Sequence, residues 1–200
     1  DHIGHARAVL QRSQANICIS HGTWLASDAP SWGLDERRIQ WMHDATASTI
    51  GALQIHPFTV PHDAREPLQL TCTDGEVTLG VVTDLGHVSE HVVESLQGCN
   101  ALILETNHDT DLLAKSAYPP FLKSRISGRL GHLSNQASAQ LMERVWHPHL
   151  TYVLAAHLSE RNNTPELARS ALDASLQNRP VEVQVASPTA SSPWIKVCRA

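Results

Sequence analysis

Acids and histidines, the residue types most able to do chemistry here, gather at the ends of apolar runs. Asp84 ends the run VVTD and His157 ends VLAAH. Glu105 and His108 follow the apolar start of LILETNHD, and His62 follows FTVP. Because the carboxyl ends of strands in an α/β sheet meet at one edge, we expect these side chains at a common rim. Imidazoles and carboxylates brought together there can bind divalent metals or transfer protons.

Each of these residues also has an ordinary structural interpretation. A single histidine at a strand end is often a turn residue or a hydrogen-bonded core residue, and an aspartate there is often a turn or helix cap. Four such endings in one chain are harder to explain in this way. From the residues alone both interpretations remain open.

The composition narrows the class of protein. The chain has 200 residues, of which 42% are hydrophobic and 18% charged, which indicates one globular domain with a substantial core. A formal net charge of −5 argues against a protein that coats nucleic acid, although a local basic patch is still allowed. Four cysteines form no C-x-x-C pair, and no apolar run approaches the roughly 20 residues that span a bilayer. We therefore expect reduced thiols, no membrane segment and a cytoplasmic location.

Periodicity and turn residues predict alternating strands and helices, hence an α/β fold. Helices are expected at residues 3–14, 34–43, 88–98, 133–146 and 164–176, with Ser134 and Thr164 as caps of the last two. A short strand that ends at a polar turn is expected within residues 16–23, and further strands at 52–63 (interrupted by Pro57 and Pro61), 101–109, 150–163 and 181–187, with a hairpin over 68–84 that turns at Asp74-Gly75.

Six motifs together resemble one family. They are DH at residues 1–2, VPHDA at 60–64, TDLGHVSE at 83–90, ALILETNHD at 101–109, GHLSN at 131–135 and AAHLSERNNTPELA at 155–168. In this order they are similar to the metallo-β-lactamase-fold hydrolases, specifically the YycJ/WalJ-like branch, over nearly the whole chain. The resemblance implies an αββα sandwich, with two mixed β-sheets flanked by helices.

The start of the chain falls inside the superfamily signature H-x-H-x-D-H, whose last two residues Asp1 and His2 match. The resemblance therefore implies that residues 1–200 are a single, N-terminally incomplete domain. The first strands and two metal-ligand histidines are expected upstream of Asp1.

The resemblance also assigns roles at the site. Asp1, His2 and His157 resemble ligands of a second metal ion, His62 a ligand of the first, and Asp84 the carboxylate that bridges both. The implied cofactors are two divalent ions, zinc or manganese, which can clamp a phosphate between them.

Beside the metals, Glu105 and His132 resemble a carboxylate–histidine pair that delivers a proton to the leaving oxygen. The alternative for His132 is a structural hydrogen bond within the GHLSN turn. His108 is expected to line or support the site.

The segment YPPFLKSRISGRLGH is the candidate substrate-binding part of the sequence. Its basic residues Lys123, Arg125 and Arg129 precede His132 and have aromatic neighbours in Tyr118 and Phe121, as expected of an edge that binds phosphates and stacks bases. An ordinary solvated loop is the alternative. The resemblance favours a 5′-to-3′ exonuclease acting on DNA.

Two other functions stay open. One is a hydrolase of a small molecule, such as a cyclic phosphodiester, a thioester or a lactone, because one fold serves many chemistries. The other is a non-catalytic binding module. With two ligands outside it, the 200-residue chain by itself is expected to be inactive.

Overall fold

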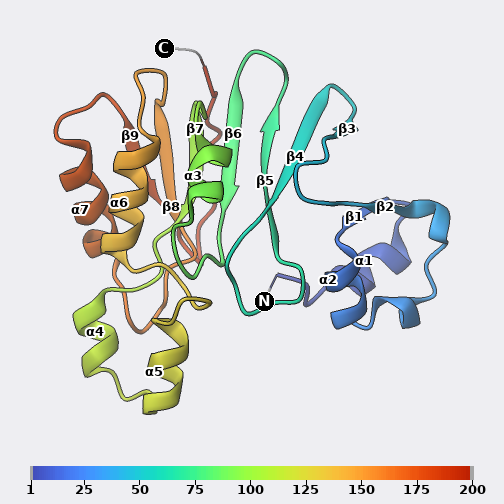
Figure 1. The fold of residues 1–200 in the computed structure, drawn as a ribbon, viewed down its shortest axis with the longest axis horizontal. Helices are drawn as coiled ribbons and strands as arrows, with labels where there is room; N and C mark the ends of the chain where they lie inside the picture. The colour runs from blue at the N-terminus through green and yellow to red at the C-terminus, as the bar shows by residue number, and fades with distance from the viewer. Residues whose placement is uncertain (1, 199–200) are drawn as a thin grey trace.

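A seven-stranded mixed sheet forms the centre of the computed structural model, which describes residues 2–198 (Figure 1). The strand order is β3-β4-β5-β6-β7-β8-β9; neighbours are antiparallel from β3 to β6 and parallel from β6 to β9. The bounds are β3 (Ser48–Ile50), β4 (Leu53–Thr59), β5 (Leu68–Thr73), β6 (Thr78–Val82), β7 (Ala101–Glu105), β8 (Tyr152–Ala156) and β9 (Glu182–Val185). The predicted α/β class is confirmed.

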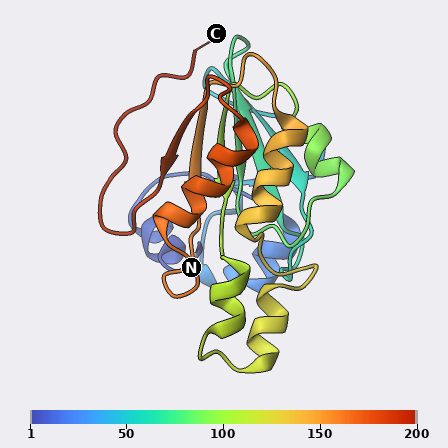
Figure 2. The same ribbon diagram turned by 90° about the vertical axis from the view of Figure 1, so that its left-hand side faces the viewer.

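Three helices cover one face of this sheet: α3 (Glu90–Leu96), α6 (Asn135–Val145) and α7 (Pro165–Leu176) (Figure 2). Fully buried Leu102, Leu104 and Val153 on the strands pack with helix residues such as Leu141 and Leu172 in one apolar core. Burial of this apolar area is the main force that holds the sheet and helices together.

Caps begin the helices where the sequence indicates. Ser134 and Thr164 accept hydrogen bonds from the backbone N–H groups of Ala137 and Leu167, as predicted. Ser89 caps α3 in the same way. The loop that leads into each helix is therefore held at a defined point, which matters because site residues lie in these loops.

The opposite face of the sheet is met by the C-terminal tail, which runs up along it to the chain end in Figure 2. Residues 192–195 and Val197 line a hollow of about 320 Å³ together with Leu79, Ile103 and Leu154 of the central strands. Below the carboxyl ends of the parallel strands, α4 (Thr110–Lys115) and α5 (Pro120–Ile126) project from the body of the molecule (Figure 1).

A small unit at the edge contains α1 (Ala6–Arg12), β1 (Ile17–Ile19), α2 (His21–Ala26) and β2 (Ile39–Trp41), with short 3-10 turns at Ala29–Trp32 and Glu36–Arg38. Trp24 and Trp32 form its core with Leu10 and Ile19. Among the described residues no helix is both long and apolar enough to cross a bilayer.

One sequence prediction in this unit is wrong. Residues 34–43 do not form an α-helix, because Asp35 caps only a 3-10 turn and Ile39–Trp41 then pair in parallel with Ile17–Ile19. The short strand expected within residues 16–23 is present and ends at Ile19; the polar turn expected after it is the first turn of α2, because Ser20 accepts a hydrogen bond from the Thr23 N–H. Side-chain capping decides both cases.

Pro57 does not interrupt β4, contrary to prediction. The short strand β3 pairs only with Leu53–Ile55, so Pro57 faces no ladder partner on that side and needs no N–H there. The strand continues to Thr59 and leads directly into the loop that carries His62.

Two loops at the carboxyl ends of the strands are in close contact at Gly86. A Cβ on Gly86 would lie 2.3 Å from the carbonyl oxygen of Arg129, and the Gly86 N–H donates to the carbonyl of Pro61 at 2.7 Å. The loop after β6 therefore reaches the segment before His132 only because residue 86 has no side chain.

We expect Gly86→Ala to lower the free energy of unfolding by about 1–3 kcal/mol, because the added methyl must displace backbone rather than a flexible side chain. Urea denaturation measures this. Gly4→Ala, where a Cβ meets nothing within 4 Å, is the matched control and should change stability little. Equal effects at the two positions would contradict the packing account.

Candidate metal centre

Four chemically active side chains meet at the carboxyl ends of the parallel strands. Glu105 is the last residue of β7, His157 directly follows β8, and Asp84 lies two residues after β6. Together with His132 they offer donor atoms that all lie within 4.8 Å of one another. The structure thus brings three of the strand-end residues, Asp84, Glu105 and His157, together with His132; His108 is not in this group.

Glu105 is the buried centre of this group, with a relative exposure of 0%. Its Oε1 accepts hydrogen bonds from Nδ1 of His132 and Nδ1 of His157, both at 2.8 Å. Its Oε2 accepts the backbone N–H groups of Leu85 at 2.8 Å and Leu133 at 3.2 Å. Because both oxygens are used within the protein, Glu105 orients the site rather than offering a free metal ligand.

The hydrogen bonds decide the protonation of Glu105. Burial raises the pKa of its carboxyl, but the bonds from His132 and His157 and from the Leu85 N–H outweigh burial and bring the pKa to about 2. The same contact with Glu105 raises the pKa of His157 against the opposing effect of burial. An ionised Glu105 holds the proton of each imidazole on Nδ1 and leaves Nε2 of each ring for other partners.

Three imidazole Nε2 atoms surround Asp84. His2 Nε2 lies 2.5 Å from Asp84 Oδ2, and the Nε2 atoms of His62 and His157 lie 3.6 and 3.9 Å from Oδ1. His62 is oriented by its Nδ1, 3.1 Å from the carbonyl oxygen of Gly131. Donor atoms this close can share an ion whose bonds are about 2.0–2.2 Å long.

The donor set fits a divalent metal. It combines imidazole nitrogen with carboxylate oxygen and contains no thiolate, a mixture suited to zinc, manganese or iron. Each of His62 and His157 is also held through its second nitrogen, the arrangement that fixes metal-ligating histidines. The predicted ligand Asp1 lies outside the described residues.

Two residues of the site have strained backbone conformations. Asp84 and His157 both adopt positive φ values, +52° and +57°, which non-glycine residues rarely adopt. Strain of this kind persists only where surrounding contacts enforce it, and it clusters at functional sites. The sequence contains no glycine or asparagine at either position that would have revealed it.

The predicted substrate residues have partners within the chain. Lys123 Nζ donates to the carbonyl of Ala114 at 2.6 Å, and Arg129 Nη2 lies 3.3 Å from His87 Nε2. Arg125 Nε donates to Asp63 Oδ2 at 2.6 Å. Arg125 and Asp63 line a hollow of about 170 Å³ together with His132, so Arg125 lies close to His132.

His108 is buried, with 2% exposure, and burial lowers the pKa of its imidazole. Its predicted contact with substrate remains a prediction.

Sequence reasoning missed two features here. The first is Asp63, whose pKa is lowered by its hydrogen bond with Arg125. Oδ1 of Asp63 also lies 3.6 Å from Nε2 of His62. The signal was the His-Asp dipeptide in VPHDA. The buried hydrogen bonds between the side-chain amides of Asn135 and Asn163 behind the site were also missed, because nothing in the sequence pairs two asparagines that lie far apart along the chain.

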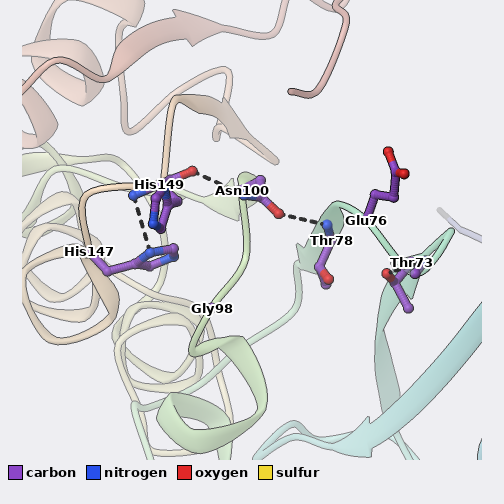
Figure 3. Close-up of a pocket in the computed structure, with 8 residues that line it drawn as sticks. Thr73, Glu76, Thr78, Gly98, Asn100, His147 and His149 are labelled. Carbon is purple, nitrogen blue, oxygen red and sulfur yellow. Dashed lines mark hydrogen bonds between the residues drawn. The ribbon is translucent and has the colours of Figure 1, made fainter. Parts of the chain in front are cut away.

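A separate hollow of about 550 Å³ lies at the amino ends of the same strands (Figure 3). Asn100 spans it, accepting from the Thr78 N–H at 2.8 Å and donating to the His149 carbonyl at 3.2 Å. His147 accepts the His149 N–H at 3.3 Å and faces the Cys99 carbonyl at 3.0 Å. These groups hold the loops together, and the carboxylate–imidazole cluster lies at the other end of the strands.

Two curated relatives match most of the chain, although no family model does. The chain is 30% identical over 181 residues to the exodeoxyribonuclease YycJ of Bacillus anthracis, which covers 90% of this chain and 68% of the relative. It is 30% identical over 171 residues to the exodeoxyribonuclease WalJ of Streptococcus pneumoniae, covering 84% and 63%. The chain therefore spans about two thirds of the length of these relatives.

Solved structures share the fold at low identity. The metallo-β-lactamase-fold protein YhfI of Bacillus subtilis superposes with a TM-score of 0.63 at 14% identity, over 92% of this chain and 68% of its own. Zn²⁺-bound PqqB of Methylobacterium extorquens superposes with a TM-score of 0.63 at 16% identity, over 93% and 67%.

We expect acid to destabilise the metal-free protein through Glu105. Its folded pKa of about 2 lies below the ordinary 4.5, so its contribution to stability is complete above pH 4.5 and is lost as the pH falls toward 2. Urea denaturation in the presence of a chelator, over that range, measures the slope.

Glu105→Gln should remove this part of the pH dependence, whereas Glu94→Gln, at an exposed position on α3, should preserve it. A slope that is unchanged in Glu105→Gln would contradict the assignment.

Proposed function

Because the chain belongs to the YycJ/WalJ branch of the metallo-β-lactamase-fold proteins, we propose that it is a metal-dependent phosphodiesterase that removes nucleotides from the 5′ end of DNA. The observation that carries the proposal is the ring of three imidazole Nε2 atoms around Asp84. His132, which is held by the buried Glu105, lies next to this ring. The two curated relatives are named exodeoxyribonucleases, which supports DNA as the substrate. The proposed location is the cytoplasm.

The proposed cofactors are two divalent ions, zinc or manganese. His2, His157 and Asp84 would hold one ion, and His62 would contribute to the other, with Asp84 shared between them. Such ions, when bound, lower the pKa of a coordinated water and neutralise charge on the phosphate. The protein's part is to aim the Nε2 atoms, which it does through Glu105 and the Gly131 carbonyl.

His132 is proposed to protonate the leaving oxygen. Glu105 holds its Nδ1 at 2.8 Å, so the proton that is transferred sits on Nε2 at the far side of the ring. His132, Arg125 and Asp63 line one hollow of about 170 Å³, in which we propose that the leaving group lies. A positioned acid of this kind increases the rate by about 10²–10⁴-fold.

The proposed substrate edge is α5 and the segment that follows it. Arg125 and Arg129 place positive charge beside the site, and their partners Asp63 and His87 fix the direction of each guanidinium. Phe121 is 75% exposed on the same helix, so its ring is available to stack on an unpaired base.

We expect Asp84→Ala in the full-length protein to abolish DNA cleavage and to reduce bound metal, because the variant loses the carboxylate that faces three imidazoles. Elemental analysis of the purified protein and an exonuclease assay on 5′-labelled DNA measure both effects. Asp111→Ala, at an exposed position on α4, is the matched control. Wild-type metal content in Asp84→Ala would refute the assignment.

His132→Ala should keep the metals and slow DNA cleavage by about 10²–10⁴-fold. A p-nitrophenyl phosphodiester, whose leaving group needs no proton, should be much less affected. His91→Ala, which removes a surface histidine paired with Asp44, provides the control. An equal loss on both substrates would mean that His132 acts only through structure.

A further inference from the structure

Residue 157 has a backbone conformation that its own side chain does not favour. His157 has φ = +57°, in the left-handed region where a Cβ is crowded, although it must present Nε2 toward Asp84 and Nδ1 toward Glu105 at once. An extended or helical backbone at this position would send the ring elsewhere. Some contact must therefore hold the peptide itself, in addition to the ring.

Asn107 makes that contact. Its side-chain Nδ2 donates to the backbone carbonyl oxygen of His157 at 2.9 Å. The bonded group must be the NH₂ of the amide, because the carbonyl end of the amide would face the oxygen of His157 with no proton between them. The backbone carbonyl of Asn107 also accepts the Ser159 N–H at 2.8 Å, so two points of the segment that leaves His157 are tied to one residue.

Asn107 also joins the other two parts of the site. It lies two residues after Glu105 on the same strand end, and its own N–H donates to the carbonyl of Leu133 at 3.0 Å, next to His132. Asn107 is 8% exposed. Its position is thus set by the sheet, and it transmits that position to two loops.

We propose that Asn107 is the positioning residue of His157. Its side-chain amide holds the left-handed peptide so that the imidazole reaches Glu105 and Asp84 together. Asparagine suits this role because it donates without charge, whereas an aspartate of the same shape would face the carbonyl with a negative oxygen. The inference rests on the proposed function only where it concerns metal affinity.

A neighbouring asparagine pair provides the comparison. Asn163 and Asn135 exchange side-chain hydrogen bonds at 2.8 and 2.9 Å, and Asn163 also donates to the Thr106 carbonyl at 2.8 Å. Asn163 is as buried as Asn107, at 7% against 8%, and its side-chain amide bonds to Asn135, Thr106 and Thr164 rather than to the His157 carbonyl. Loss of Asn163 therefore measures the cost of breaking the amide network behind the site.

The experiment compares Asn107→Asp with Asn163→Asp in the full-length protein. In the metal-free state, ¹⁵N-imidazole NMR detects the Nδ1 protons of His132 and His157 bonded to Glu105, assigned by His132→Gln and His157→Gln. We expect Asn107→Asp to lose the His157 signal and keep that of His132, and Asn163→Asp to keep both.

Metal affinity is the second readout. Competition with a chromophoric chelator should show Zn²⁺ and Mn²⁺ binding about 10–100-fold weaker in Asn107→Asp, the usual effect of losing a group that supports a ligand. Asn107→Ser, which keeps a short neutral donor, should recover part of this loss. Asn163→Asp should bind both ions as the wild type does.

Intact His157 signal and wild-type affinity in Asn107→Asp would overturn the proposal, as would equal losses in Asn163→Asp. If Asn107→Asp does not fold, Asn107→Ala, which removes the donor without adding a charge, is compared with Asn163→Ala by the same two readouts and the same criteria apply. If the wild-type protein cleaves no DNA while the Asn107→Asp variant still loses the His157 signal, the proposed function is rejected and this inference stands.

Discussion

The whole site depends on one buried negative charge. Glu105 has no exposed surface, and a carboxylate in that position is tolerated only when its oxygens are fully hydrogen-bonded. Its four donors belong to three different loops: Leu85 follows Asp84, Leu133 follows His132, and His132 and His157 donate through their rings. The need to satisfy Glu105 therefore fixes the relative positions of the loops that carry the reactive groups.

The stability of the fold compensates for locally unfavourable conformations at the site. Asp84 and His157 occupy left-handed conformations, and Gly86 meets the Arg129 carbonyl at a distance that excludes a side chain. Each is unfavourable locally, and each lies just beyond the end of a strand whose core residues are fully buried. A rigid parallel sheet can impose such geometry on the short segments that leave it, as strained residues at functional sites require.

Sequence reasoning succeeded where chemistry and periodicity coincided. Asp84, Glu105 and His157 follow apolar runs, and parallel strands must bring such endings together. His132 follows no strand, so periodicity could not place it; only the motif GHLSN did. Residues 34–43 and Pro57 were misjudged because a single cap and the pairing of a neighbouring short strand decided their structure. These are tertiary facts that a window of sequence does not contain.

Protons and metal ions compete for the same nitrogen atoms in this cluster. Glu105 keeps a proton on Nδ1 of His157 and thereby makes its Nε2 a stronger ligand, but the same charge raises the pKa of the ring and favours a second proton there. Asp84, which faces the Nε2 atoms, acts in the same direction as Glu105 on His157. A divalent ion that enters must displace such protons, so metal binding at this site releases them and weakens as the pH falls. The acid that organises the site thus also makes the binding of a metal ion by His157 depend on pH.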